Sequence, residues 1–96
     1  MKLKDENKNV FCFTTTHVMN ENSLIIDVYY DEGGVWQMFS KENPTMDNGL
    51  AVCVQCMLDF DKTLYDLPDL KKGQAAMREN ATSEWYVEKY RTEIEK

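Results

Sequence analysis

The stretch that decides the fold is LIIDVYYDEGGVWQMFS, which spans residues 24–40. Apolar side chains alternate along its first part, and the pattern resumes after the four residues DEGG. Alternation with a period of two is typical of a half-buried strand, and paired glycines can adopt the positive φ angles of a tight hairpin turn. We therefore predict a β-hairpin over residues 24–40.

Both faces of this hairpin carry large apolar side chains. One face has Leu24, Ile26, Val28 and Tyr30, and the other has Ile25 and Tyr29. Trp36 is expected in the core, as is usual for a tryptophan in a small sheet. A sheet that helices cover on one side only would leave one of these sets exposed. Either the helices cover both faces, or a partner protein covers the face that the helices leave exposed. That partner could be a second copy of the chain.

Two further strands flank the hairpin in the sequence. Residues 10–16 are rich in aromatic and β-branched side chains, and residues 50–54 form a short apolar run. Residues 55–60 either extend the second of these strands or open a helix, because periodicity cannot decide so short a stretch. Asp61 is expected to cap a turn that holds Leu64.

The last third of the chain is expected to be helical. Asp69 can cap a helix over residues 70–79, and Ser83 can cap another with Tyr86, Tyr90 and Ile94 on one side. Strands first and helices last predict an α+β fold, in which C-terminal helices pack on a small antiparallel sheet.

The 96 residues are sufficient for one domain. We expect residues 1–9, which are mostly polar, to be flexible and residues 10–96 to be folded. The start of the chain lacks the apolar stretch of a signal peptide, and no apolar run approaches the length of a membrane helix. The sequence therefore predicts a cytoplasmic protein that does not engage a membrane.

The net charge of −6 is unevenly distributed along the chain. Residues 21–69 hold ten acidic side chains against two lysines, a net −8, while the segment on either side carries +1. This balance argues against binding to nucleic acid, which needs a basic surface. If the acidic side chains lie together, they form a face that attracts a basic protein; otherwise they only keep the domain soluble.

The residue types of metal and redox sites are Cys12, His17, Cys53 and Cys56. CVQC at residues 53–56 has the spacing of a zinc or redox pair, and Cys12 and His17 could complete four ligands. A thioredoxin-type pair would open a helix within a βαβ unit, which this sequence does not predict. We expect core thiols, with no bound metal or cofactor and no enzyme activity, and keep a metal- or thiol-dependent domain as the alternative.

One known family has a similar order of motifs. GVWQMFS at residues 34–40 is followed by Asp47-Asn48, an apolar run, and then Asp61 and Leu64. This pattern resembles the immunity protein 33-like family, first catalogued as a bacterial domain of unknown function. The likeness covers residues 10–67 and continues more weakly through AMRE at residues 76–79 to Trp85. It departs at Lys41, where relatives often have glycine, and at Lys62, where they usually have proline.

The resemblance implies a cytosolic bacterial protein that binds a cognate toxin domain and blocks it, and it supplies no catalytic residues. With the acidic charge, it predicts a basic toxin domain as partner. The expected contact residues are Asp27, Tyr29, Asp31, Glu32, Asp59 and Asp61. The competing hypothesis is an oligomeric scaffold, a homodimer through the hairpin without a toxin partner.

Overall fold

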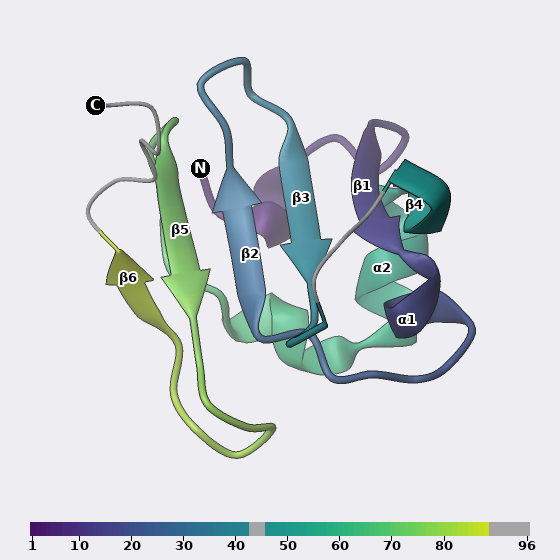
Figure 1. Cartoon of the computed structure of the whole chain (residues 1–96). Coiled ribbons are helices and arrows are strands. Elements are labelled where there is room, and N and C mark those ends of the chain that lie inside the picture. The colour runs from purple at the N-terminus through teal and green to yellow at the C-terminus, as the bar shows by residue number, and fades with distance from the viewer. Residues whose placement is uncertain (43–45, 89–96) are drawn as a thin grey trace, which may run out of the picture.

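The computed structural model describes residues 1–42 and 46–88. In this part of the chain six strands form one sheet (Figure 1): β1 (Phe11–Thr15), β2 (Asp27–Tyr30), β3 (Trp36–Phe39), β4 (Gly49–Cys53), β5 (Gln74–Met77) and β6 (Tyr86–Glu88). The helices are α1 (Thr16–Met19) and α2 (Val54–Phe60), with 3-10 turns η1 (Leu3–Asp5), η2 (Met46–Asn48) and η3 (Lys62–Asp66). The fold is α+β, as the sequence predicts.

The sheet is antiparallel except at one pair of strands. Its order is β4-β1-β3-β2-β5-β6, and only β1 and β3 run parallel. The predicted hairpin is confirmed, with Val28 opposite Met38, although β2 begins at Asp27 and not at Leu24. The predicted strands over residues 10–16 and 50–54 are β1 and β4. Residues 55–60 are helical and do not extend β4. They belong to α2, which follows β4 directly.

The hairpin turn depends on Gly34 and Asp31. Gly34 has a φ of +84°, a conformation in which any other L-residue would be strained. Its N–H donates to the carbonyl oxygen of Asp31, and the Asp31 N–H donates to that of Val35, each at 2.9 Å. The Asp31 carboxylate also accepts hydrogen bonds from the N–H groups of Gly33 and Val35. Asp31 therefore holds the turn in place.

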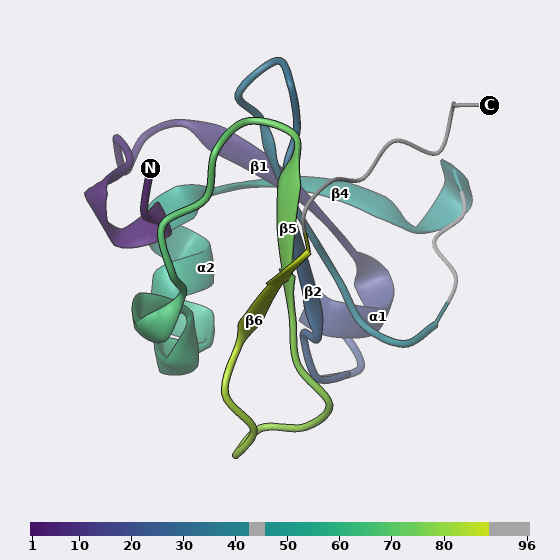
Figure 2. The ribbon, with the colours of Figure 1, turned by 90° about the vertical axis from the view of Figure 1, so that its left-hand side faces the viewer.

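The core lies between the sheet and α2. Figure 2 shows α2 and the neighbouring 3-10 turns on one side of the strands. Val28, Trp36 and Met38 are completely buried, as are Met57 and Leu58 of α2. The Trp36 ring stacks on Tyr30 with their centroids 4.3 Å apart. The expected core position of Trp36 is confirmed.

The helix predicted over residues 70–79 is wrong, because Gln74–Met77 form β5 and pair with β2. Asp69, the expected cap, accepts a hydrogen bond from the backbone nitrogen of Met1 instead. Gly73 turns the chain at a φ of +93°, and its N–H donates to the Tyr30 carbonyl oxygen at 2.7 Å. Alanine favours helices, but the free edge of β2 offers a ladder of backbone hydrogen bonds, and tertiary context overrides propensity.

The helix predicted from Ser83 is also wrong within the described residues. Tyr86–Glu88 form β6, with Tyr86 opposite Met77 of β5. The Asn80 side chain accepts the N–H of Thr82 and makes a turn, so the chain returns alongside β5. Tyrosine and valine suit such a strand. Tyr90 and Ile94 lie outside the described residues.

The first nine residues, expected to be flexible, contribute one side chain to the core. Leu3 lies in η1 and is completely buried. The Leu70 N–H donates to the Met1 carbonyl oxygen at 3.0 Å, which ties this segment to the chain before β5. Sequence periodicity could not reveal this contact, because a single apolar residue in a polar stretch has no period.

We expect Leu3→Ala to lower the free energy of unfolding by about 2 kcal/mol. This is the low end for a buried leucine, because η1 is a short 3-10 turn that can shift to fill the cavity. Urea unfolding followed by circular dichroism measures the change, and Lys4→Ala, at an exposed position in the same turn, should stay within about 0.5 kcal/mol of the parent. Equal losses in the two variants would contradict the packing of Leu3.

Candidate functional site

One face of the sheet points away from α2. Strand register places Phe13, Gln37, Tyr29 and Ala75 in one row across four strands. The next row contains Phe39, Asp27, Met77 and Tyr86. Along β1, β2 and β3 these residues alternate with buried ones, such as Cys12, Val28 and Met38, so the rows project to the side opposite the core, although Ala75 of β5 is itself buried. We call Phe11, Phe13, Asp27, Tyr29, Gln37, Phe39, Met77 and Tyr86 the open face.

The open face is rich in exposed aromatic side chains. Phe11 is 64% exposed, Phe13 47% and Tyr86 53%. Tyr29, Phe39 and Met77 are half-buried between them. Aromatic residues and methionine are enriched where proteins bind one another. The arrangement is therefore suited to docking a protein.

The charge of this face is acidic or neutral. None of the six strands contains a lysine or an arginine, whereas Asp27 lies on the open face. The nearby hairpin tip has an exposed Glu32, but Lys72 lies close to Gly34 at the same tip. A partner that combines an apolar surface with basic side chains would complement this face. An acidic partner would meet no lysine or arginine on the strands.

The six predicted contact residues do not come together on one surface. Asp27 and Tyr29 lie on the open face, and Asp31 and Glu32 lie at the tip of the same hairpin. Asp59 and Asp61 lie at the end of α2, on the other side of the sheet. The acidic charge of residues 21–69 is thus divided between the two sides, and a single partner surface cannot meet all of it.

Asp31, Asp59 and Asp61 already have partners within the chain. Asp31 accepts a hydrogen bond from the Gln37 side chain at 3.0 Å in addition to those that hold the turn. The exposed Asp59 accepts one from Gln55 at 2.8 Å and lies 3.7 Å from the Lys62 ammonium group. Asp61 caps η3 by accepting the N–H of Thr63.

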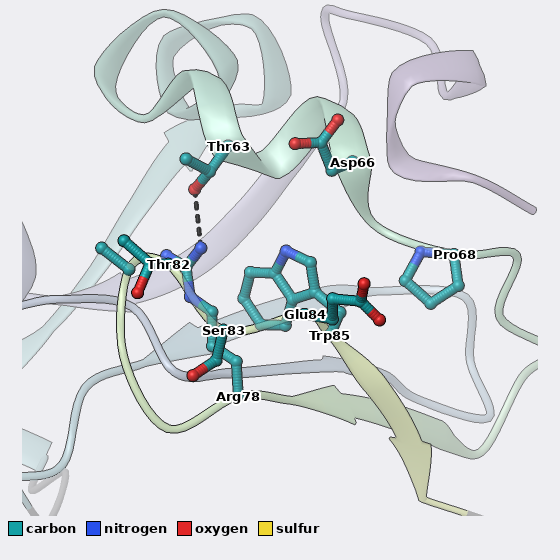
Figure 3. Close-up of a pocket in the computed structure, with 9 residues that line it drawn as sticks. Thr63, Asp66, Pro68, Arg78, Thr82, Ser83, Glu84 and Trp85 are labelled. Atoms are coloured by element: carbon teal, nitrogen blue, oxygen red, sulfur yellow. Dashed lines mark hydrogen bonds between the residues drawn. The ribbon is translucent and has the colours of Figure 1, made fainter.

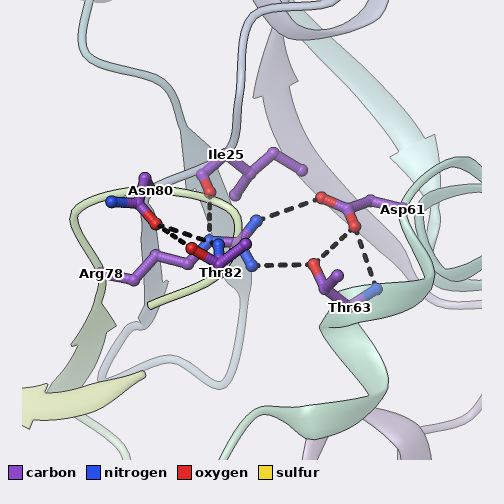
Figure 4. A network of polar contacts seen from close by, with 6 residues as sticks. All are labelled: Ile25, Asp61, Thr63, Arg78, Asn80 and Thr82. Atoms are coloured by element: carbon purple, nitrogen blue, oxygen red, sulfur yellow. Dashed lines mark hydrogen bonds and ion pairs between the residues drawn. The ribbon is translucent and has the colours of Figure 1, made fainter. Parts of the chain in front are cut away.

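Asp61 also forms an ion pair with a buried arginine (Figure 4). Arg78 Nη2 lies 3.3 Å from Asp61, Nη1 donates to the Thr63 hydroxyl at 2.8 Å, and Nε donates to the Ile25 carbonyl oxygen at 3.0 Å. Burial lowers the pKa of Arg78, and the charge of Asp61 raises it in compensation. This network joins β5 to η3, so Asp61 has a structural role.

A cavity of about 390 Å³ opens beside Arg78 (Figure 3). The Trp85 ring stacks 4.2 Å from the guanidinium carbon, and Asp66 and Glu84 also line the space. Arg78 is the only cation among the lining residues, and Asp61 already neutralises it. Two further carboxylates make the cavity unsuitable for an anion, so it is the weaker candidate site.

The residues of the alternative metal hypothesis are separated in the structure. Cys53 pairs with Phe11 at one end of β1, while His17 follows the other end and lies 3.3 Å from Glu21. Across residues 1–42 and 46–88, no group of three or more histidine, cysteine or acidic residues is placed to hold a metal ion. Cys53 and Cys56 do lie in contact, and α2 opens at this pair although no βαβ unit surrounds it. A helix at this point is one of the two alternatives that the sequence left open for residues 55–60.

Sequence reasoning missed the exposed aromatic residues of the open face. The signal was present at residues 10–16, where Phe11 and Phe13 alternate with Cys12 and Thr14. Aromatic residues at every second position mark one face of a strand, but only the tertiary structure shows which face the helices cover.

Comparisons with protein-family models, curated proteins and solved structures find no match to this chain. Among the described residues, no helix has the length and apolar character needed to cross a bilayer.

Proposed function

We propose that the chain is a protein-binding domain that docks a basic partner on the open face of its sheet. The observation that carries the proposal is that strands without any lysine or arginine expose aromatic side chains on this face, Phe11 and Phe13 on β1 and Tyr86 on β6. A protein domain with an apolar surface surrounded by basic side chains fits this face, because burial of the rings supplies affinity and the six strands carry no lysine or arginine that would repel such a partner.

We further propose that the partner is a cognate bacterial toxin domain, which the chain blocks by covering its active site. This step rests on the resemblance of residues 10–67 to immunity proteins. Acidic charge on a binding domain speeds encounter with a basic toxin. The proposal assigns the chain no reaction, no metal and no cofactor, and places it in the bacterial cytoplasm.

Phe13→Ser should weaken binding to the toxin domain by about 10- to 100-fold, equivalent to about 1.4–2.7 kcal/mol, because Phe13 lies in the central rows of the open face. The probe is the C-terminal domain of the protein encoded by the adjacent reading frame, inactivated by mutation and titrated in a calorimeter. Co-expression with the active form should protect cells less well when the chain carries Phe13→Ser.

Phe60→Ser is the matched control, because Phe60 is a similarly exposed phenylalanine, at 38%, on α2. It should bind as the parent does. Equal losses in the two variants, or no complex with the parent chain, would refute the proposal. A homodimer in light scattering that dissociates with Phe13→Ser would instead identify the open face as the contact between two copies.

A further inference from the structure

Two of the three cysteines are in direct contact at the junction of β4 and α2. Cys53 is the last residue of β4 and the N-cap of α2, and Cys56 lies in the first turn of that helix. Their sulfur atoms are 2.6 Å apart, and the Cys56 N–H donates to Cys53 Sγ at 3.2 Å. Cys56 is exposed and Cys53 is half-buried. Small disulfide compounds can therefore reach the pair from solvent.

We propose that Cys53 and Cys56 form a reversible dithiol–disulfide site that exchanges with small disulfides of the glutathione class. The inference is independent of the proposed partner, because it rests on the sulfur contact, the exposure of the pair and the spacing of two residues between the cysteines. A bond between residues this close in sequence requires no movement of distant elements.

The exchange proceeds in two balanced steps. The Cys53 thiolate attacks one sulfur of glutathione disulfide, which breaks the disulfide and releases one glutathione thiolate. The Cys56 thiolate then attacks Cys53 Sγ in the mixed disulfide and releases the second. The two cysteine protons pass to the two glutathione thiolates, so the chain is oxidised by two electrons and the glutathione disulfide is reduced to two thiols.

The hydrogen bonds of the pair favour Cys53 as the first nucleophile. The Cys56 S–H and N–H groups stabilise the Cys53 thiolate and lower its pKa. The same contact raises the pKa of Cys56, which must keep its proton to donate it. The lowered pKa raises the fraction of Cys53 that is thiolate, and Cys56 supplies the resolving thiol.

Cys12 provides an internal control. It lies on β1 with its side chain in the core, and burial, followed by the nearby Cys53 and Cys56, raises its pKa to about 12. A buried thiol of this kind is inert at neutral pH. The reactivity of Cys53 and Cys56 can therefore be compared with that of an unreactive thiol in the same chain.

The test equilibrates the full chain with mixtures of reduced and oxidised glutathione, quenches with acid, and alkylates the remaining thiols after denaturation. Trypsin places Cys12 in the peptide of residues 9–41 and both other cysteines in that of residues 42–62. We expect oxidation to remove two hydrogen atoms from the second peptide and to protect its cysteines from alkylation. Dithiothreitol should reduce the disulfide and make both cysteines available to alkylation again. Cys12 should be alkylated under every condition. In the reduced native chain, Cys53 should react with iodoacetamide at least about tenfold faster than Cys12.

Two variants separate the steps. Cys56→Ser should stop at a stable glutathione adduct on Cys53, and Cys12→Ser should form the same disulfide as the parent. Retention of three free thiols at every glutathione ratio would overturn the proposal. So would a disulfide that includes Cys12, or a mixed adduct that persists in the parent chain.

Discussion

Asp61→Ala will lower the free energy of unfolding by about 3–5 kcal/mol, because it leaves the Arg78 charge buried without a counter-ion. The Arg78 side chain is only 1% exposed, so most of its surface has no contact with water. The change also removes the cap of η3 and the partner of the Thr63 hydroxyl. Each kcal/mol corresponds to about 4–8 °C in the melting temperature of a domain of this size, so the loss is easily measured by thermal or urea unfolding.

Two neighbouring variants test this explanation. Asp61→Asn keeps an oxygen to cap η3, so it should be more stable than Asp61→Ala by about 1 kcal/mol. Asp59→Ala removes an exposed carboxylate whose partner, Lys62, is also exposed, and should cost less than about 1 kcal/mol. If Asp61→Ala costs no more than Asp59→Ala, the ion pair does not stabilise the fold.

Trp36→Ala is expected to cost about 3–5 kcal/mol of unfolding free energy through the cavity it creates. The Trp36 side chain is completely buried and stacks on Tyr30, its partner in the strand pair next to the hairpin turn. Its indole N–H also donates to the Glu6 carboxylate at 3.1 Å, which links the hairpin to the first residues of the chain. Urea unfolding of the variant measures the loss, and Trp36→Phe, which keeps a ring in the core, should lose less.

Tyr86→Ala is the control for the removal of an aromatic ring from the sheet. Tyr86 lies on β6 and is 53% exposed, so its removal should cost less than about 1 kcal/mol. Similar losses for the two variants would show that the hairpin core is not centred on Trp36. A large loss for Tyr86→Ala alone would mean that the open face stabilises the monomer and does not await a partner.

Local sequence was sufficient to predict the hairpin and the strands near residues 10–16 and 50–54. The alternation of apolar and polar residues, the β-branched residues and the DEGG turn are patterns of only a few residues. They can therefore be recognised without the rest of the chain. The α+β class rested on strands first and helices last, and it is confirmed although the helices predicted over residues 70–79 and from Ser83 are strands. The expected core position of Trp36 is also confirmed. Of the predicted contact residues, Asp27 and Tyr29 lie on the face that the structure leaves open.

The tertiary structure alone decided the remainder, because the deciding contacts are distant in sequence. Residues 74–77 have the composition of a helix, but the free edge of β2 made them a strand. Asp61 was expected to cap a turn, which is confirmed, and to contact a partner, but its ion pair with the buried Arg78, seventeen residues away, was not predicted. Which aromatic face stays open depends on where α2 packs, and no local pattern contains that information. The sequence by itself determined the strands with a strong local pattern, β1 to β4; packing determined that β5 and β6 are strands, which strands are neighbours, and which face they present.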